Sequence, residues 1–138
     1  VRESLSAAFE AAAARADSPL AKIERAFLAH VAFVAANPGV PRVMFHELQY
    51  PGDSPVRSYV RAMIADYRKR LVQLFAQAKS VGELPSDLDT ALAAVLFIGA
   101  VQGLVIQGSL AGDEARMVKR ARRLWPILLD GYRGRRTP

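Results

Sequence analysis

The chain has 138 residues, of which 51% are hydrophobic, and this length supports one compact domain with a substantial core. It contains no cysteine, which excludes disulfides, thiolate catalysis and thiolate metal ligands. Its formal net charge of +6 is compatible with nucleic-acid binding, but much of the excess follows residue 115, where a basic run is more often a solvated helix face.

Residues 1–16 are rich in alanine and predict a helix, with Leu5 and Phe9 at helical spacing. The sequence begins with valine rather than methionine, and this helix has no cap residue at its start. We therefore expect the chain to be a fragment or a processed product of a longer protein.

Residues 19–36 predict the second helix. Ser18 can cap its start, and Pro19 suits the first helical position. Asn37-Pro38-Gly39 ends it, because proline cannot continue a helix and glycine readily closes one. The apolar positions recur at steps of three and four and form a core face, namely Leu20, Ile23, Phe27, Val31 and Val34.

A short helix over 41–48 and the longest helix, over 54–81, follow in the sequence. Ser54-Pro55 repeats the pairing of a cap with a proline at the start of the longer one. Its predicted inward face consists of Val56, Val60, Met63, Tyr67, Leu71, Leu74 and Ala78. Three arginines of another face, Arg57, Arg61 and Arg68, are expected to reach water.

The next helix, over 86–111, has no charged residue between Ala91 and Ile106. Ser86 and Asp89 are spaced for a capping box at its start. A helix that is apolar all round must be buried all round, in a core, an interface or a membrane. The membrane alternative has the required length and a Gly99-x-x-x-Gly103 motif, but short loops join this helix to amphipathic helices that need a partner.

The last helix is predicted over 113–133, followed by a loose tail over 133–138. Pro126 lies inside it and is expected to kink it. Its apolar positions are Val118, Ala121, Trp125, Leu128 and Tyr132. No strand-like alternation and no internal repeat is present, so the sequence predicts an all-α fold of six helices in a single domain, residues 1–138.

The order of these elements resembles the C-terminal regulatory domain of tetracycline-repressor (TetR) family transcription factors. The resemblance rests on NPGVPRVMFHEL (37–48), on GELPSDLDTALAAVLFIGAVQGLVIQGSL (82–110), and within it on Gln102-Gly103-Leu104. It implies a cytoplasmic homodimer whose effector, a small molecule, releases DNA from an N-terminal helix-turn-helix domain. That domain is absent from this sequence, and residues 1–16 would be the remnant of the helix that connects to it, so this chain alone should not bind DNA.

The resemblance also implies that the last two helices form a four-helix bundle with those of a second subunit. The alternative is that both glycines pack within the monomer. The candidate interface residues are Gly99, Gly103, Leu104, Gln107, Leu124, Trp125 and Leu128.

In this family the effector pocket lies among the helices over 19–36, 41–48, 54–81 and 86–111. Residues that combine an apolar body with a polar tip would orient a largely apolar ligand, whereas the alternative for each is plain core packing. The candidates with a polar tip are His30, His46, Tyr59, Tyr67 and Gln102. The candidates for the apolar lining are Phe27, Phe33, Phe45, Met63 and Phe97.

Catalysis and metal binding find little support in the sequence. His30 and His46 lack the spacing of a helical zinc pair, and no nucleophile motif or phosphate-binding loop is present, so we expect no enzyme, no metal and no cofactor. A second hypothesis is a stand-alone helical interaction module whose basic last helix binds an acidic partner or nucleic acid.

Overall fold

The computed structural model describes the backbone of residues 2–134 and, from residue 5 on with the exception of Ser6, their side chains. The elements are α1 (Arg2–Ala14), α2 (Pro19–Ala36), α3 (Gly39–Leu48), α4 (Pro55–Ser80), α5 (Thr90–Ala111), a 3₁₀ turn η1 (Glu114–Arg116) and α6 (Met117–Arg133). Within residues 2–134 there is no strand, which confirms the all-α prediction. The predicted tail lies, from residue 135 on, outside the described residues.

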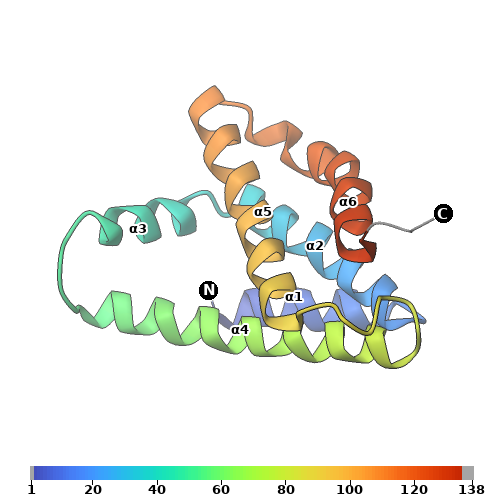
Figure 1. Cartoon of the computed structure of the whole chain (residues 1–138). Helices are drawn as coiled ribbons and strands as arrows, with labels where there is room; N and C mark the ends of the chain where they lie inside the picture. Colours follow the sequence, from blue (N-terminus) through green and yellow to red (C-terminus); the bar gives the residue numbers. More distant parts are fainter. Residues whose placement is uncertain (1, 135–138) are drawn as a thin grey trace.

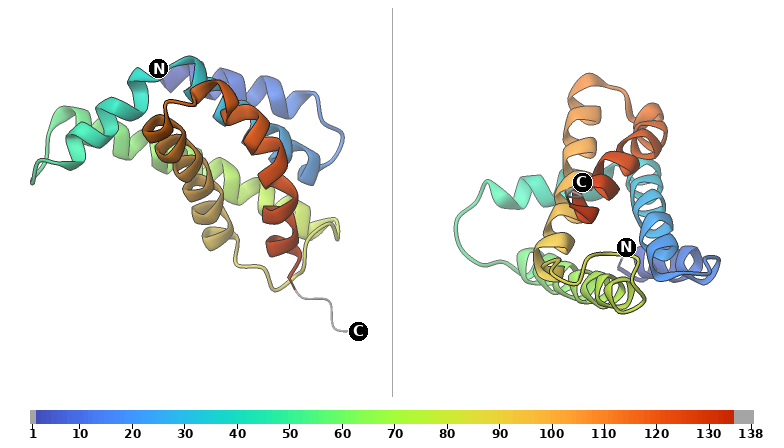
Figure 2. Two further views of the ribbon diagram at one scale, coloured as in Figure 1. Left: turned by 90° about the horizontal axis from the view of Figure 1, so that it is seen from above. Right: turned by 45° about the vertical axis from the view of Figure 1, so that its right-hand side comes forward.

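Helix α2 is the centre of the packing, since it contacts α1, α4, α5 and α6. Helix α4 spans the width of the molecule beneath the others, and α3 stands off to one side at its amino-terminal end (Figure 1). Helices α5 and α6 lie side by side, as the second set of views shows (Figure 2). The core between these helices is aromatic, with Phe27 of α2 lying 5.3 Å from Phe97 and 5.8 Å from Trp125 between ring centroids.

Two helix starts follow the predicted pairing of serine with proline. The Ser18 hydroxyl accepts a hydrogen bond from the Ala21 N–H at 3.1 Å, and Ser54 accepts one from Arg57 at 3.0 Å. Each bond satisfies one of the N–H groups that have no partner inside the helix.

The capping box predicted for Ser86 and Asp89 is wrong. The turn before α5 is closed by the Leu88 N–H, which donates to the Pro85 carbonyl at 3.2 Å. This turn delays the helix to Thr90, so Asp89 itself becomes the cap and accepts from the Leu92 N–H at 3.1 Å. The last helix also starts later than predicted, because Gly112 turns the chain with φ +66° and η1 precedes α6. Pro126 lies inside α6 without ending it.

Helix α3 is held by polar contacts rather than by core packing, since none of its residues is buried. The Arg57 guanidinium donates to the backbone carbonyls of Glu47 at 2.8 Å and Tyr50 at 2.7 Å. The Ser54 hydroxyl donates to the Glu47 carboxylate at 2.8 Å. Arg57, which was expected to reach water, is half-buried and also joins α3 to the start of α4.

Candidate functional site

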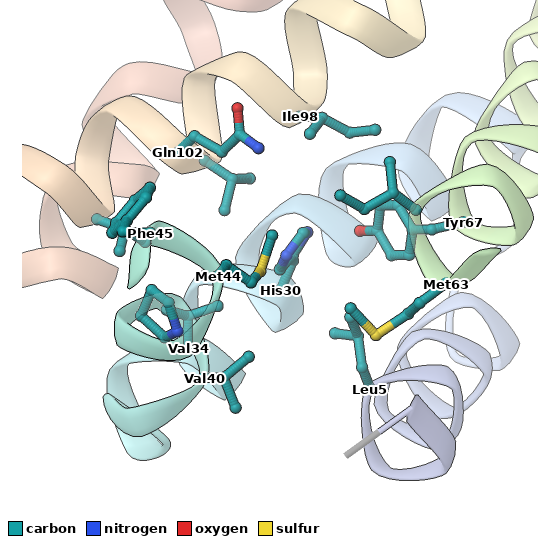
Figure 3. A pocket seen from close by; sticks show the side chains of 14 residues that line it. Leu5, His30, Val34, Val40, Met44, Phe45, Met63, Tyr67, Ile98 and Gln102 are labelled. Atoms are coloured by element: carbon teal, nitrogen blue, oxygen red, sulfur yellow. The ribbon is translucent and has the colours of Figure 1, made fainter. Parts of the chain in front are cut away.

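A pocket lies where α3 faces α2, α4 and α5, with α1 at one edge (Figure 3). Its cavity volume is about 80 Å³, and no charged side chain lines it. The lining residues are Leu5, His30, Val34, Val40, Pro41, Met44, Phe45, Met63, Ile64, Tyr67, Ile98, Val101, Gln102 and Val105. An apolar pocket with a few polar groups is the usual form of a small-molecule site.

A second hollow of about 340 Å³ adjoins the pocket between α3 and α4. Met44, Ile64 and Gln102 line both, so they form the boundary between the two. The second hollow is more polar, because Glu47, Arg57 and Arg61 also line it. We call the first cavity the inner pocket and the second the outer hollow, and a ligand that passes these three side chains would occupy both.

Two buried polar atoms of the pocket have no hydrogen-bond partner among the described residues: Nδ1 of His30 and the hydroxyl of Tyr67. The two rings meet edge to face, with centroids 4.8 Å apart. In the close view the Tyr67 oxygen points toward His30 (Figure 3). Burial lowers the pKa of His30 to about 4 and raises the pKa of Tyr67, so both groups are neutral at pH 7.

The structure brings half of the predicted pocket residues together. His30, Phe45, Met63, Tyr67 and Gln102 line the pocket. The other candidates lie elsewhere. Phe27 and Phe97 are fully buried against each other in the core, and Phe33 packs against the edge of that core. His46 and Tyr59 are exposed.

Sequence reasoning missed most of the aliphatic lining. On α5, Ile98, Val101 and Val105 recur at helical spacing with Gln102, which was a signal for one shared face. Leu5 of α1 and Val34 of α2 were recognised as helix-face residues, but periodicity does not tell which neighbour a face meets.

The opposite side of α5 is an exposed apolar face. It follows steps of four and three residues through Leu92, Leu96, Gly99, Gly103, Ile106 and Leu110. The exposed fraction of the side chain is 64% for Leu92, 48% for Leu96, 40% for Ile106 and 84% for Leu110. A Cβ added at Gly99 or Gly103 would meet nothing within 4 Å, so the alternative that these glycines pack within the monomer is wrong. Gly108, by contrast, lies against Met117.

The predicted interface residues divide between this face and the core. Gly99 and Gln107 are exposed, whereas Gly103, Leu104 and Leu124 are half-buried. Trp125 and Leu128 are 4% and 7% exposed, because the apolar stripe of α6 packs onto the chain's own core. These last two leave almost no surface for a second subunit to cover, which corrects their assignment to the interface.

Within residues 2–134, α5 is the one helix whose length and hydropathy would suit a membrane span. The core helix of a soluble protein passes the same test, and α5 packs against α2, α4 and α6 through its inner face. No cluster of three potential metal-ligating side chains occurs in the described part of the chain.

An all-helical fold with an apolar pocket between its middle helices is typical of the effector-binding domains of transcription regulators. The sequence profile of the family described as "Tetracyclin repressor-like, C-terminal domain" matches residues 51–125, more than half of the chain. The chain belongs to this family, and it is an effector-binding domain of a transcription regulator.

Among solved structures, the fatty acid degradation regulator FadR from Bacillus halodurans is similar to this chain. The TM-score is 0.74 at 20% sequence identity, over 94% of this chain and 71% of that one. At this identity the likeness concerns the fold. A search of curated proteins finds no significant match.

Proposed function

We propose that this domain binds a largely apolar small-molecule effector in the pocket between α2, α3, α4 and α5. The carrying observation is the lining, which is aliphatic and aromatic and includes no charged side chain. The outer hollow gives room for a ligand that the inner pocket alone would not hold. The description of FadR as a fatty acid degradation regulator supports the proposal of a lipophilic effector for this domain.

The mechanism that we propose passes through α1. Leu5 of α1 lines the pocket, and Glu10 of α1 accepts a hydrogen bond from Arg70 of α4 at 2.8 Å. A ligand that touches Leu5 can favour one position of α1 over another, to the extent that its affinity differs between the two. In a complete regulator α1 would lead to the DNA-binding domain, and the effector would thereby change the fit to operator DNA.

A bulky side chain at the boundary of the two hollows tests the pocket. Met44→Trp should lower the affinity for the neutral apolar probe N-phenyl-1-naphthylamine at least about tenfold, because the indole fills space that the probe needs. The measurement is a calorimetric titration, in which the unaltered chain should bind one probe per chain. The matched control is Val43→Trp, since Val43 is the neighbouring α3 residue and is 51% exposed. Equal affinity in the two variants would show that the probe binds elsewhere.

We also propose that the exposed apolar face of α5 joins two copies of the chain. Its spacing of four and three residues is that of a helix-packing seam, and the two open glycines let another helix approach closely. Ile127 of α6 adds to the apolar surface, being 68% exposed. An obligate dimer of this kind typically buries about 2,000 Å² or more.

Gly103→Leu should convert the dimer to a monomer, because the added side chain cannot fit a close helix crossing. Within the monomer, a Cβ added at this position would meet nothing within 4 Å, and circular dichroism checks that the variant remains helical. Light scattering measures the mass, and Ala76→Leu on the exposed side of α4 is the control for added apolar bulk. A Gly103→Leu protein that remains dimeric would exclude this face as the interface.

A further inference from the structure

The inner end of the pocket holds a polar pair that the protein leaves without partners. Nδ1 of His30 and the hydroxyl of Tyr67 are both covered from solvent, and no described group hydrogen-bonds to either atom. Buried polar atoms are nearly always hydrogen-bonded, because the bond that they lose to water must be replaced. Two such atoms without partners line the same pocket, which indicates that a molecule from outside the chain supplies their hydrogen bonds.

The same core shows that the fold can satisfy a buried tyrosine. The hydroxyl of Tyr132 on α6 donates to the Ala93 carbonyl on α5 at 3.0 Å. Both tyrosines are buried, at 8% exposure for Tyr67 and 2% for Tyr132. Both side chains are buried, but only the Tyr132 hydroxyl has a hydrogen-bond partner among the described residues.

We propose that the effector carries one uncharged hydroxyl group, of the alcohol or phenol type, which accepts from or donates to Tyr67 and His30 while its apolar body fills the pocket. This inference rests on the proposed function of the pocket. A hydroxyl group suits the pair because it is donor and acceptor at once, so it fits either tautomer of the neutral imidazole.

Ionised head groups fit this end poorly. Among the residues that line the inner pocket, His30 and Tyr67 are the titratable ones, and both are neutral at pH 7. A carboxylate or an ammonium group would lose its water there without gaining an opposite charge. The arginines, Arg57 and Arg61, lie in the outer hollow instead, where Arg57 already binds two backbone carbonyls and Arg61 pairs with Asp53.

The apolar body has surfaces on several helices. Leu5 of α1, Val34 of α2, Met63 of α4 and Val101 of α5 line the same pocket as the polar pair. A chain that continues past Met44 would enter the outer hollow. The expected ligand is thus an apolar alcohol that points its oxygen inward.

A set of matched probes tests this orientation on the whole chain: 1-octanol, its methyl ether and octanoate, each titrated by calorimetry at pH 7. We expect 1-octanol to bind at least about tenfold more tightly than octanoate and more tightly than the ether, which cannot donate. Tyr67→Phe should lower the octanol affinity about tenfold and the ether affinity by a smaller factor, because the ether can accept a hydrogen bond from Tyr67 but cannot donate one. Tyr132→Phe is the matched control, and it should alter none of the three affinities.

His30→Leu gives a second, independent reading, since it removes Nδ1 from the other side of the pair. It should also weaken octanol selectively, while far-ultraviolet circular dichroism checks that each variant remains helical. Octanoate binding as tightly as octanol, or octanol binding unaffected by Tyr67→Phe, would overturn the inference and leave the apolar pocket in place. Failure of every probe to bind would contradict the proposed function itself.

Discussion

The two ends of the core treat the same kind of side chain differently. At one end Tyr132 packs 4.9 Å from Phe75 between ring centroids, and its hydroxyl is bonded to Ala93. At the other end Tyr67 packs between Phe9 and His30, and its hydroxyl has no partner among the described residues. The first end is complete as the chain folds, and we propose that a ligand completes the second.

The covering elements explain this difference. The complete end is closed by the link between α4 and α5, where Leu84 is buried and Glu83 accepts a hydrogen bond from the Leu20 N–H at 3.2 Å. The pocket end is covered by α3, which buries none of its residues and is held at its carboxyl end by Arg57. A cover held by a few polar contacts can move more readily than one packed into the core.

The pH dependence of stability should reveal His30 at the pocket end, a half-buried residue whose Nδ1 is covered from solvent. We expect this effect to be larger than that of removing the Tyr67 hydroxyl. The pKa of His30 is about 4 in the folded chain and has its ordinary value of 6.5 in the unfolded chain. Between these values the unfolded state binds more protons, so stability falls as the pH is lowered from 6.5 toward 4. The loss amounts to up to about 3 kcal/mol.

Urea unfolding at pH 7 and pH 4.5 measures this loss. His30→Gln should remove the part due to His30, whereas His46→Gln, which replaces the exposed histidine, should keep it. The same pH dependence in the His30→Gln protein as in the unaltered chain would mean that His30 is not held neutral by burial.

The fold was largely predictable because the helix ends carry local signals. Ser18-Pro19 and Ser54-Pro55 place two helix starts within a residue, since the cap and the proline act through neighbouring backbone groups. Ser86 misled the prediction because a second turn, closed by Leu88 and Pro85, intervenes before α5. Leu84, beside this turn, is buried in the core, and no local sequence pattern reports which helices cover it.

The site was predictable in part. Residue type alone picked out His30 and Tyr67, and the structure adds that both atoms lack partners. Residue type could not separate Phe97, which lies in the core, from Ile98, one position further, which lines the pocket. Whether a residue of α5 lines the pocket depends on where α3 lies. None of the α3 residues is buried, so no apolar pattern in the sequence predicts the position of this helix.

The uniformly apolar helix α5 also shows what sequence patterns cannot predict. Its composition predicts burial all round, and its inner face with Phe97 and Val101 is indeed buried. Its outer face, with Leu92 and Leu110, remains exposed in the single chain. Sequence patterns report that a face is apolar but not what covers it, and for the outer face of α5 we propose a second copy of the chain.

The most direct test of the incomplete end compares Tyr67→Phe with Tyr132→Phe by urea unfolding at pH 7 without ligand. Removing the unpartnered Tyr67 hydroxyl should raise the free energy of unfolding by about 1 kcal/mol, and removing the bonded Tyr132 hydroxyl should lower it by about 1 kcal/mol. Opposite signs are the predicted result. Equal destabilisation by both substitutions would show that Tyr67 is already satisfied within the fold, and it would contradict the account of the pocket.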